Sequence, residues 1–185
     1  MKELSLNVLD IAENSLKAGA TLTEILIFED EQHLRLTIKD NGCGMKNEVL
    51  KGVANPFYTT RTTRKVGMGL PLLKQEAEQT DGTFDITSKH VSEFPLNHGT
   101  TVTAQFNKNH IDYTPLGDTV STVITLIQGH EDRDFIFEHR YFKNSVQLDT
   151  RELRNQLGDV PLGTFEVLEW IKAYLNEQYD ELYHL

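Results

Sequence analysis

The sequence is poor in the features that mark secreted and membrane proteins. Its 185 residues contain a single cysteine, Cys43, which excludes an internal disulfide and fits a reducing compartment. No apolar run approaches the roughly 20 residues that a membrane span needs. The first residues mix acids and Asn into their apolar pattern, unlike a signal peptide. We therefore expect a cytoplasmic protein without a membrane partner.

Positive charge is also scarce, because 18 Lys and Arg stand against 28 Asp and Glu and give a net charge of -10. A nucleic-acid binder normally carries a basic face, so we expect no nucleic-acid partner. An acidic chain can still bind a polyanion through local cations, backbone N–H groups and a metal ion. Residues 61–65, Arg-Thr-Thr-Arg-Lys, are such a local exception, with three cations and no acid.

The rest of the composition is that of an ordinary globular chain. Its length suits one domain with a short extension, and such a chain buries roughly two thirds of its unfolded surface. Apolar spacing near 3.6 residues predicts helices, and alternation predicts strands. The expected helices span residues 3–18, 46–54, 69–80 and 164–182. The expected strands span residues 21–29, 33–39, 83–89 and 100–106, and a mobile polar loop spans residues 57–67.

The motif Pro115-Leu116-Gly117 marks the boundary that we predict between two parts of the chain. Residues 1–114 form the larger domain, and residues 115–185 form a small C-terminal α+β extension of unknown role. Asp149 has the position of an N-cap for a short helix in this extension. Residues rich in β-branched and aromatic types predict three short strands, at 120–127, 134–142 and 145–148.

The first predicted helix carries a polar stripe opposite its apolar face. Asp10, Glu13, Asn14 and Lys17 stand at positions i, i+3, i+4 and i+7. This spacing places them on one side of a helix. A solvated helix face explains such a stripe by itself. Asn14 argues for more, because Asn is a mediocre helix former and here sits in mid-helix.

Two glycine-rich motifs follow. Residues 40–45, Asp-Asn-Gly-Cys-Gly-Met, come directly after a predicted strand. Gly42 and Gly44 allow positive φ and close approach of the backbone to a ligand. An acid at the end of a strand can accept a hydrogen bond from an amino group such as adenine N6, although a tight turn explains the motif equally well. Residues 67–70, Gly-Met-Gly-Leu, open a predicted helix, whose first N–H groups suit phosphates.

Together with residues 98–101, His-Gly-Thr-Thr, these motifs resemble the four boxes of the Bergerat-fold (GHKL) ATPases. That superfamily includes histidine-kinase catalytic domains, DNA gyrase, MutL and the large heat-shock chaperones. The resemblance covers residues 3–107, with boxes that read LDIAENSLKAGAT, DNGCGM, NPFYTTRTTRKVGMGLPLL and HGTTV. It implies an α+β protein, a two-layer α/β sandwich whose mixed, mostly antiparallel sheet has helices on one face. ATP is expected between these helices and a lid.

The resemblance implies ATP and Mg²⁺ as ligands and gives residues their roles. Asn14 matches the asparagine that helps hold the magnesium ion, and Asp40 matches the acid that reads the adenine amino group. Thr100 or Thr101 matches a threonine near the adenine, and cations of the lid are expected to reach the γ-phosphate. The full set of implied nucleotide-binding residues is Asn14, Lys17, Asp40, Gly42, Gly44, Met45, Thr60, Arg61, Arg64, Lys65, Gly67, Met68, Gly69, Leu70, Thr100 and Thr101.

Asp10 bears on the type of reaction. In MutL and gyrase an acid four residues before the magnesium-binding Asn is the general base for water, and Asp10 has this position. Asp is one methylene shorter than the usual Glu, which matters for a base that must reach within about 3 Å. Lys17 instead matches a phosphate-contacting lysine of histidine kinases. Three classes stay open: a slow ATPase, a serine or histidine kinase that acts on a partner as anti-sigma-factor kinases do, and a nucleotide-gated interaction module without turnover.

We expect a stand-alone regulatory protein that acts through a protein partner. The motif around Asn14 begins almost at Met1, so we expect no helical hairpin with a phosphoacceptor His before it. Residues 130–133, His-Glu-Asp-Arg, resemble a phosphoacceptor box only loosely, because they lie between predicted strands. In the last helix we place Phe165 on the packed side and Trp170 on the exposed side. The exposed side suits a partner or a homodimer contact, and packing of this helix on its own strands is the commoner alternative.

Overall fold

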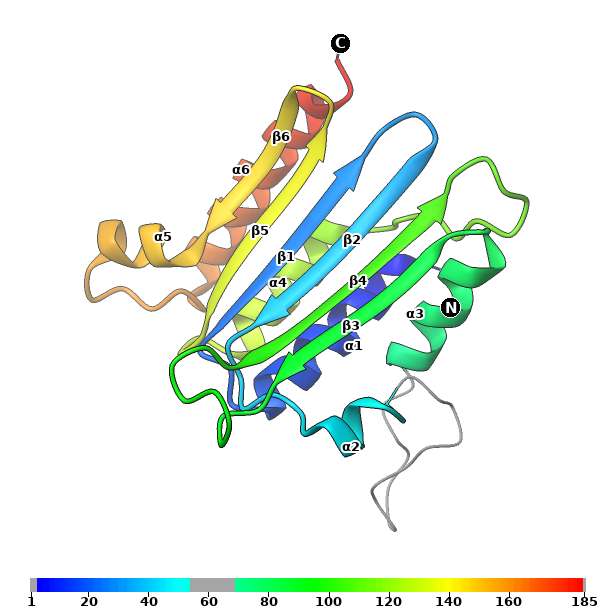
Figure 1. Cartoon of the computed structure of the whole chain (residues 1–185). Helices are drawn as coiled ribbons and strands as arrows, with labels where there is room; N and C mark the ends of the chain where they lie inside the picture. Colours follow the sequence, from blue (N-terminus) through cyan, green and yellow to red (C-terminus); the bar gives the residue numbers. More distant parts are fainter. Residues whose placement is uncertain (1–2, 54–68, 185) are drawn as a thin grey trace.

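A mixed sheet runs through the part of the chain that the computed structural model describes, residues 3–53 and 69–184. Its strands are β1 (Leu22–Glu29), β2 (His33–Asp40), β3 (Thr83–Lys89), β4 (Gly99–Asn107), β5 (Asp134–Tyr141) and β6 (Asn144–Asp149). Within these described residues the sheet has six strands in the order β3-β4-β2-β1-β5-β6 (Figure 1). Neighbouring strands are antiparallel except β1 and β5, which are parallel.

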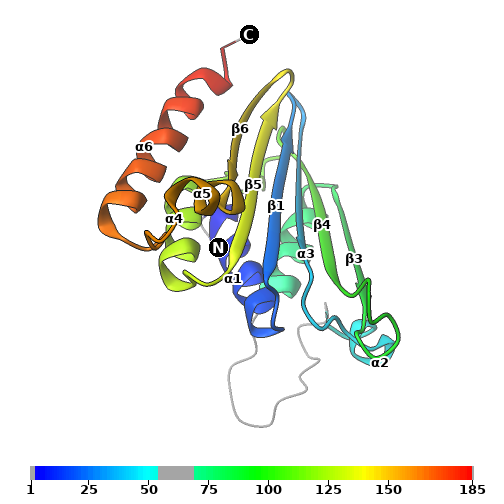
Figure 2. The ribbon, with the colours of Figure 1, turned by 90° about the vertical axis from the view of Figure 1, so that its left-hand side faces the viewer.

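Helices cover one face of this sheet. The helices of the described residues are α1 (Leu4–Lys17), α2 (Asn47–Leu50), α3 (Gly69–Gln79), α4 (Thr119–Gly129), α5 (Thr150–Leu157) and α6 (Phe165–Leu182). Figures 1 and 2 show α1, α3, α4 and α6 on the same side of the sheet, with the opposite face left open. The predicted two-layer α/β sandwich with a mixed, mostly antiparallel sheet is confirmed. Among the described residues, no helix combines the length and the apolar character that crossing a membrane requires.

The core lies between the sheet and the helices because side chains alternate along each strand. In β1, Ile25 and Ile27 are 1% and 2% exposed, whereas Phe28, which faces the open side, is 52% exposed. Leu36 of β2 and Phe106 of β4 lie in the same buried layer. Burial of this apolar surface is the main favourable contribution to folding.

The elements predicted before residue 115 are confirmed wherever the structure describes them. α1 ends as expected, with Gly19 in the left-handed region at φ 79°. The β1–β2 hairpin closes at Asp30, whose Oδ1 accepts hydrogen bonds from the N–H groups of Gln32 and His33, both at 2.7 Å. The predicted helix of residues 46–54 is shorter than expected, since α2 spans Asn47–Leu50. The predicted loop of residues 57–67 lies outside the described residues.

The segment of residues 120–127 forms a helix, so the prediction of a strand there was wrong. Asp118 caps α4, because its side chain accepts a hydrogen bond from the N–H of Ser121 at 2.8 Å. Buried residues recur at helical spacing, as Val123 and Ile127 are 2% and 1% exposed. The β-branched composition of the segment favoured a strand, but the helical apolar face and the N-cap outweigh that preference.

The strands after residue 115 join the same sheet as the earlier strands. β5 lies beside β1 in parallel register, with Ile25 opposite Phe137. Phe135 and Phe137 are each 1% exposed, and they belong to the same hydrophobic cluster as the residues of β1 and β2. The predicted strands at 134–142 and 145–148 are therefore confirmed, whereas the boundary near residue 115 stays a prediction.

The last helix packs where it was expected to. Ile171 and Leu175 of α6 are fully buried, and Trp170 is 51% exposed, as predicted. Phe165 was wrongly placed on the packed side, since it is 73% exposed. Successive residues of a helix are rotated by about 100°. Phe165 therefore lies roughly a quarter of the helix circumference away from the centre of the buried face. Val167 is buried in its place.

Candidate functional site

The carboxylate of Asp40, at the end of β2, is held by three hydrogen bonds from three different segments. Its Oδ1 accepts from the N–H of Gly42 at 2.8 Å and from the N–H of Thr100 at 3.2 Å. Its Oδ2 accepts from the hydroxyl of Ser15 at 2.7 Å. Asp40 is only half-buried, so the fixed carboxylate still faces accessible space on the helix side of the sheet.

The helix α1 also carries Asn14, directly before the serine that bonds to Asp40. Ser15, which bonds to Asp40, is buried at 4% exposed, and its neighbour Asn14 is half-buried. Among the residues that the structure describes, the side-chain amide of Asn14 has no hydrogen-bond partner. Asn14, the metal-binding candidate, is followed by Ser15, which holds Asp40, the adenine-reading candidate. One turn of one helix therefore carries the metal-binding candidate and the residue that fixes Asp40.

The start of α3 packs against α1 one turn before Asn14. A Cβ added at Gly69 would stand 3.0 Å from the Cβ of Asp10 and 3.6 Å from Cγ1 of Ile11. Glycine at this position therefore allows the first turn of α3 to approach α1 closely. Asp10 is exposed and lies beside this approach. The structure thus brings Asp10, Asn14, Asp40 and Gly69 into one region.

The glycine turn after β2 is shaped by close contacts with the main chain. Gly44 has φ 67°, and a Cβ there would lie 2.0 Å from the carbonyl oxygen of Lys89. At Gly42 a Cβ would meet the carbonyl oxygen of Ala18 at 3.0 Å. The N–H of Cys43 donates to that same oxygen at 2.9 Å. This turn is therefore tied to the end of α1.

In the fourth motif, the residue that contacts Asp40 is Thr100 rather than Thr101. Thr100 has the parity of the buried residues of β4, so its side chain lies on the helix side. Its Oγ1 is 2.8 Å from Oγ of Ser88. Thr101 lies on the open side, where its partner in register is the exposed Lys39. Of the two threonines that the sequence left open, Thr100 is the one in this region.

Three polar residues of this region were missed by the sequence reasoning. Ser15 holds Asp40, and Ser88 accepts a hydrogen bond from the N–H of Met45 at 2.7 Å. His98 places Nδ1 2.6 Å from the carbonyl oxygen of Gly42. A signal for Ser15 existed, since it is a polar residue on the buried side of a helix. His98 stood in the fourth motif without an assigned role, and the contacts of Ser88 depend on strand pairing, which gave no signal.

Several predicted site residues cannot be placed in this arrangement. Thr60, Arg61, Arg64, Lys65, Gly67 and Met68 lie outside the described residues. Lys17 is exposed in the last turn of α1, and Leu70 packs partly against the hydrophobic core. Glu13, which shares the stripe with Asn14, pairs with Nε2 of His130 at 2.8 Å.

The residues present fit a magnesium ion only as one part of its ligand set. Within the described residues, no three His, Cys, Asp or Glu side chains gather into a metal-binding group. The amide oxygen of Asn14 is a hard ligand of the kind that Mg²⁺ takes, and Mg²⁺ commonly uses one or two protein ligands together with phosphates and waters. Asn14 and a bound triphosphate would be a set of that kind.

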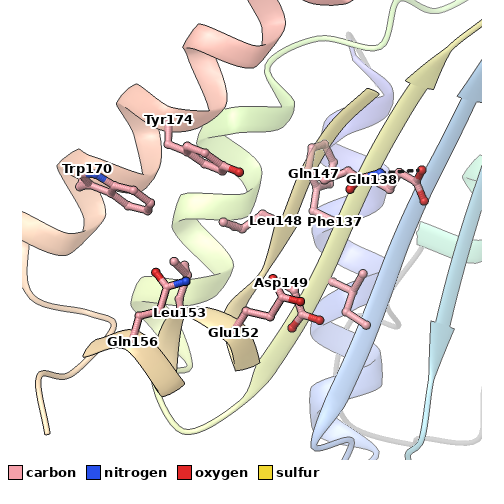
Figure 3. Close-up of a pocket in the computed structure, with 11 residues that line it drawn as sticks. Phe137, Glu138, Gln147, Leu148, Asp149, Glu152, Leu153, Gln156, Trp170 and Tyr174 are labelled. Carbon is pink, nitrogen blue, oxygen red and sulfur yellow. Dashed lines mark hydrogen bonds between the residues drawn. The ribbon is translucent and has the colours of Figure 1, made fainter. Parts of the chain in front are cut away.

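Two cavities border the sheet in the part of the chain that the structure describes. One, of about 290 Å³, is lined by Asp40 and Asn41 after β2 and by residues 96–98 of the loop before β4. The other, of about 530 Å³, lies between β6, α5 and α6 (Figure 3). None of the residues that line this larger cavity belongs to the four motifs, so it is separate from the candidate nucleotide site.

The first part of the chain is similar in sequence to known ATPases and kinases. Residues 2–110 match the protein family described as histidine kinase-, DNA gyrase B-, and HSP90-like ATPase. Sporulation kinase A of Bacillus subtilis is 32% identical over 88 residues, which cover 48% of this chain and 14% of that protein. Sensor histidine kinase YvrG of the same organism is 31% identical over 101 residues, covering 51% and 16%. The chain thus spans a small part of the length of these relatives.

Solved structures share the fold at low identity. The ATPase domain of Aquifex aeolicus MutL, solved with ADP, is 16% identical with a TM-score of 0.52, and the match covers 74% of this chain and 60% of that one. The N-terminal domain of a DNA repair protein is 17% identical with a TM-score of 0.53, covering 80% and 53%. Both matches extend beyond residue 110 of a 185-residue chain, because they cover more than the 109 residues of the family match.

Proposed function

The chain belongs to the family of histidine kinase-, DNA gyrase B- and HSP90-like ATPases, and from this premise we propose that it binds ATP with Mg²⁺ and uses the nucleotide to regulate a protein partner. The observation that carries the proposal is the meeting of Asp40, Asn14 and Gly69 around one helix. Ser15 bonds to Asp40 at 2.7 Å, Asn14 is its neighbour, and Gly69 approaches Asp10 one turn earlier.

Each residue then has a physical task. The carboxylate of Asp40, fixed by Gly42 and Thr100, accepts a hydrogen bond from the adenine amino group. The amide oxygen of Asn14 holds Mg²⁺, which neutralises phosphate charge when it is bound. The N–H groups at the start of α3 and the helix dipole favour the anionic phosphates. The exposed Lys17 and the lid cations Arg61, Arg64 and Lys65 are proposed to add charge around the triphosphate.

Isothermal titration calorimetry with Mg-ATP tests the site. Asp40→Asn keeps the shape of the side chain but places an N–H₂ group against the adenine amino group, and a hydrogen bond to a charged group is worth about 1.5–3 kcal/mol. We expect the affinity to fall by about 100-fold. Asn14→Ala should abolish magnesium-dependent binding, and the difference between titrations with and without Mg²⁺ isolates that effect.

Asp85→Asn is the matched control for Asp40→Asn, because Asp85 is exposed on β3 and on the open face of the sheet. It should bind Mg-ATP as the unmodified chain does. Thermal melts of each variant separate lost binding from lost folding. A properly folded Asp40→Asn variant with unchanged affinity would exclude Asp40 as the adenine-reading residue.

For the reaction we propose slow ATP hydrolysis that switches an interaction, with Asp10 orienting the water. Asp10 is exposed and lies beside Gly69 at the start of α3, where the γ-phosphate is expected. Phosphate release should fall by roughly 100-fold in Asp10→Asn, the size of effect that general base catalysis gives, while calorimetry shows ATP still bound. Equal phosphate release by both proteins would remove Asp10 from the reaction.

Phosphoryl transfer to a partner is the second candidate function, favoured by the relatives, which are named as kinases. Catalysis of phosphoryl transfer is mostly positioning and charge stabilisation, so the same binding residues serve both reactions. Incubation with γ-labelled ATP and candidate partner proteins distinguishes them. Label retained on a partner indicates a kinase, and label released only as phosphate indicates the ATPase.

A further inference from the structure

Three consecutive residues of the fourth motif contact the turn that follows β2. Nδ1 of His98 lies 2.6 Å from the carbonyl oxygen of Gly42. The main chain of Gly99, at φ 131°, passes so close to the carbonyl oxygen of Asp40 that an added Cβ would collide with it. The N–H of Thr100 donates to Oδ1 of Asp40 at 3.2 Å. The motif therefore contacts the turn at both Asp40 and Gly42.

The contact between His98 and Gly42 has a fixed direction. A carbonyl oxygen only accepts, so Nδ1 of His98 carries the proton and donates it to the Gly42 oxygen. The same peptide unit is held at its other end, because the N–H of Cys43 donates to the carbonyl oxygen of Ala18 at 2.9 Å. Gly42 is buried and His98 is half-buried, so water has limited access to this carbonyl. The peptide unit between residues 42 and 43 is thus fixed from two sides.

The fixed peptide matters for Asp40, because Gly42 also supplies one of the donors that orient its carboxylate. The N–H of Gly42 donates to Oδ1 of Asp40 at 2.8 Å. A group that holds the Gly42 carbonyl therefore limits where the Gly42 N–H points, and through it the direction of the Asp40 carboxylate. Gly99 and Thr100 act on Asp40 through their main chains, whereas His98 acts through its side chain. A site that is ordered beforehand loses less entropy when its ligand binds.

We propose that His98 is a positioning residue for the adenine-reading carboxylate: it holds the Gly42 carbonyl, and Gly42 in turn directs Asp40 toward the amino group of the base. The inference rests on the proposed nucleotide site and adds a determinant of base selectivity to it. Adenine presents an amino group to Asp40, whereas hypoxanthine presents a carbonyl oxygen at the same ring position, which a carboxylate repels. A well-directed Asp40 therefore favours ATP over inosine triphosphate (ITP).

Isothermal titration calorimetry of the full 185-residue chain with Mg-ATP and Mg-ITP tests the positioning. We expect the natural chain to bind ATP at least about 10-fold more tightly than ITP, as a hydrogen bond to a charged group gives. In His98→Leu, ATP binding should weaken by about fivefold and ITP binding should stay unchanged, because only adenine uses the contact with Asp40. A purely structural loss would weaken both nucleotides equally. Competition titrations extend the measurement to weakly bound ITP.

Two amide variants identify the ring nitrogen that is responsible. The amide nitrogen of Asn has the same position relative to Cβ as Nδ1 of His, and that of Gln reaches the position of Nε2. His98→Asn should therefore keep the preference for ATP, and His98→Gln should lose it as His98→Leu does. His90→Leu is the matched control, because His90 is half-buried in the same loop and its Nδ1 lies 2.7 Å from Oγ of Ser92. It should leave both affinities unchanged.

NMR of the histidine side chains checks the hydrogen bond without any nucleotide. The signals of His98 are those that are missing from the spectrum of His98→Asn, and its Nδ1 should carry the proton. A spectrum in which Nδ1 is the unprotonated nitrogen would overturn the proposal, since such a nitrogen has nothing to donate to a carbonyl.

The outcomes separate this proposal from the proposed function. A natural chain that binds neither nucleotide would refute the proposed function, and the role of His98 with it. If the natural chain prefers ATP and a folded His98→Leu variant keeps the full preference, only the positioning role is overturned. Equal weakening of ATP and ITP in that variant, or equal binding of both by the natural chain, also overturns it. If His98→Leu does not fold by circular dichroism, the comparison of His98→Asn with His98→Gln decides.

Discussion

Glu29 is a buried anion at the end of β1, between His139 of β5 and Lys108, which follows β4. It is 7% exposed, and it accepts hydrogen bonds from Nε2 of His139 at 2.9 Å and from Nζ of Lys108 at 2.5 Å. Burial alone would raise the pKa of Glu29, but the hydrogen bonds and charges of His139 and Lys108 outweigh burial and lower it to about 2. Burial and then the charge of Glu29 raise the pKa of nearby Tyr113 to about 12.

The lowered pKa predicts how stability depends on pH. Glu29 titrates near 4.5 in the unfolded chain and near 2 in the folded protein, so the folded state binds fewer protons between these values. The resulting stabilisation, on the order of 3 kcal/mol, is fully present above pH 4.5 and is lost as the pH falls toward and through 2. Urea denaturation from pH 6 to pH 2 should show this loss in the natural chain and a smaller one in Glu29→Gln.

The quantity to compare is the change of the free energy of unfolding with pH. Stability at neutral pH alone is not suitable, because Glu29→Gln also removes hydrogen bonds and would lower it for that reason. Glu177→Gln is a suitable control, since Glu177 is an exposed acid of α6. It should keep the full pH dependence. If Glu29→Gln lost as much stability between pH 5 and pH 2 as the natural chain does, the lowered pKa of Glu29 would be refuted.

Gly44 shows a residue whose identity is dictated by the backbone. Its φ of 67° and the 2.0 Å gap between an added Cβ and the Lys89 carbonyl oxygen leave no space for a side chain. Gly44→Ala should therefore lower the free energy of unfolding by at least ~2 kcal/mol. Gly129→Ala is the comparison, because nothing lies within 4 Å of a Cβ there, and it should be neutral or slightly stabilising. Thermal melts of the two variants check this difference.

At the residue scale, the sequence was informative where the chemistry forces one residue type. Asp40 and Gly44 were singled out because an acid and two glycines after a predicted strand, together with the other three motifs, match the boxes of a known family. Ser15 and Ser88 were not found, because a serine is acceptable almost anywhere and its role depends on what the fold places opposite it. The Ser15–Asp40 hydrogen bond joins residues 25 positions apart, which local patterns do not reveal.

Among the elements, α4 is the case in which local composition was misleading. Its sequence, TVSTVITLIQG, is rich in β-branched residues, which favour strands when they pack on a pleated surface. In the protein the same residues pack as one apolar stripe between α1 and α6, and tertiary packing decides the outcome. The remaining elements were predictable because their apolar periods and their turn or cap residues agreed with each other.

The N-cap of α4 should contribute measurably to stability. Asp118 accepts from the N–H of Ser121 at 2.8 Å and from its hydroxyl at 2.6 Å, and these bonds lower the pKa of Asp118. Asp118→Ala is expected to lower the free energy of unfolding by about 1 kcal/mol, the usual cost of losing a cap. Asp180→Ala, at an exposed position near the end of α6, should cause no such loss. Equal stability of Asp118→Ala and the natural chain in urea titrations would show that the cap is dispensable.

In the whole molecule, the pairing of β1 with β5 was beyond what the sequence predicts. The predicted elements at 21–29 and 134–142 were both present, but nothing in either segment specifies that they are neighbours. Their parallel pairing needs a long crossover, and here the described part of the crossover contains β2, β3, β4 and the helices α2, α3 and α4. The extension beyond residue 115 is consequently part of the sheet and of the core.

A chain truncated after residue 114 should therefore fold poorly, even though it contains all four nucleotide-binding motifs. It would lose the buried Phe135 and Phe137, the cover of α4, and the strand beside β1. An exposed strand edge with an uncovered apolar face favours aggregation. We expect no cooperative thermal transition and aggregated species in gel filtration, with the full chain as the control. A soluble fragment with a cooperative melt would show that residues 1–114 form an independent unit.

The place of β5 in the sheet also has a consequence for biosynthesis. Leu22 and its partner Asp134 are about 110 residues apart in the chain, and ribosomes add about 5–20 residues per second. The β1–β2 hairpin therefore waits roughly 6–20 s after its emergence before its final neighbour is available. During that interval the nascent polypeptide presents an unfinished sheet edge, which is prone to pair with other chains until β5 has been synthesised.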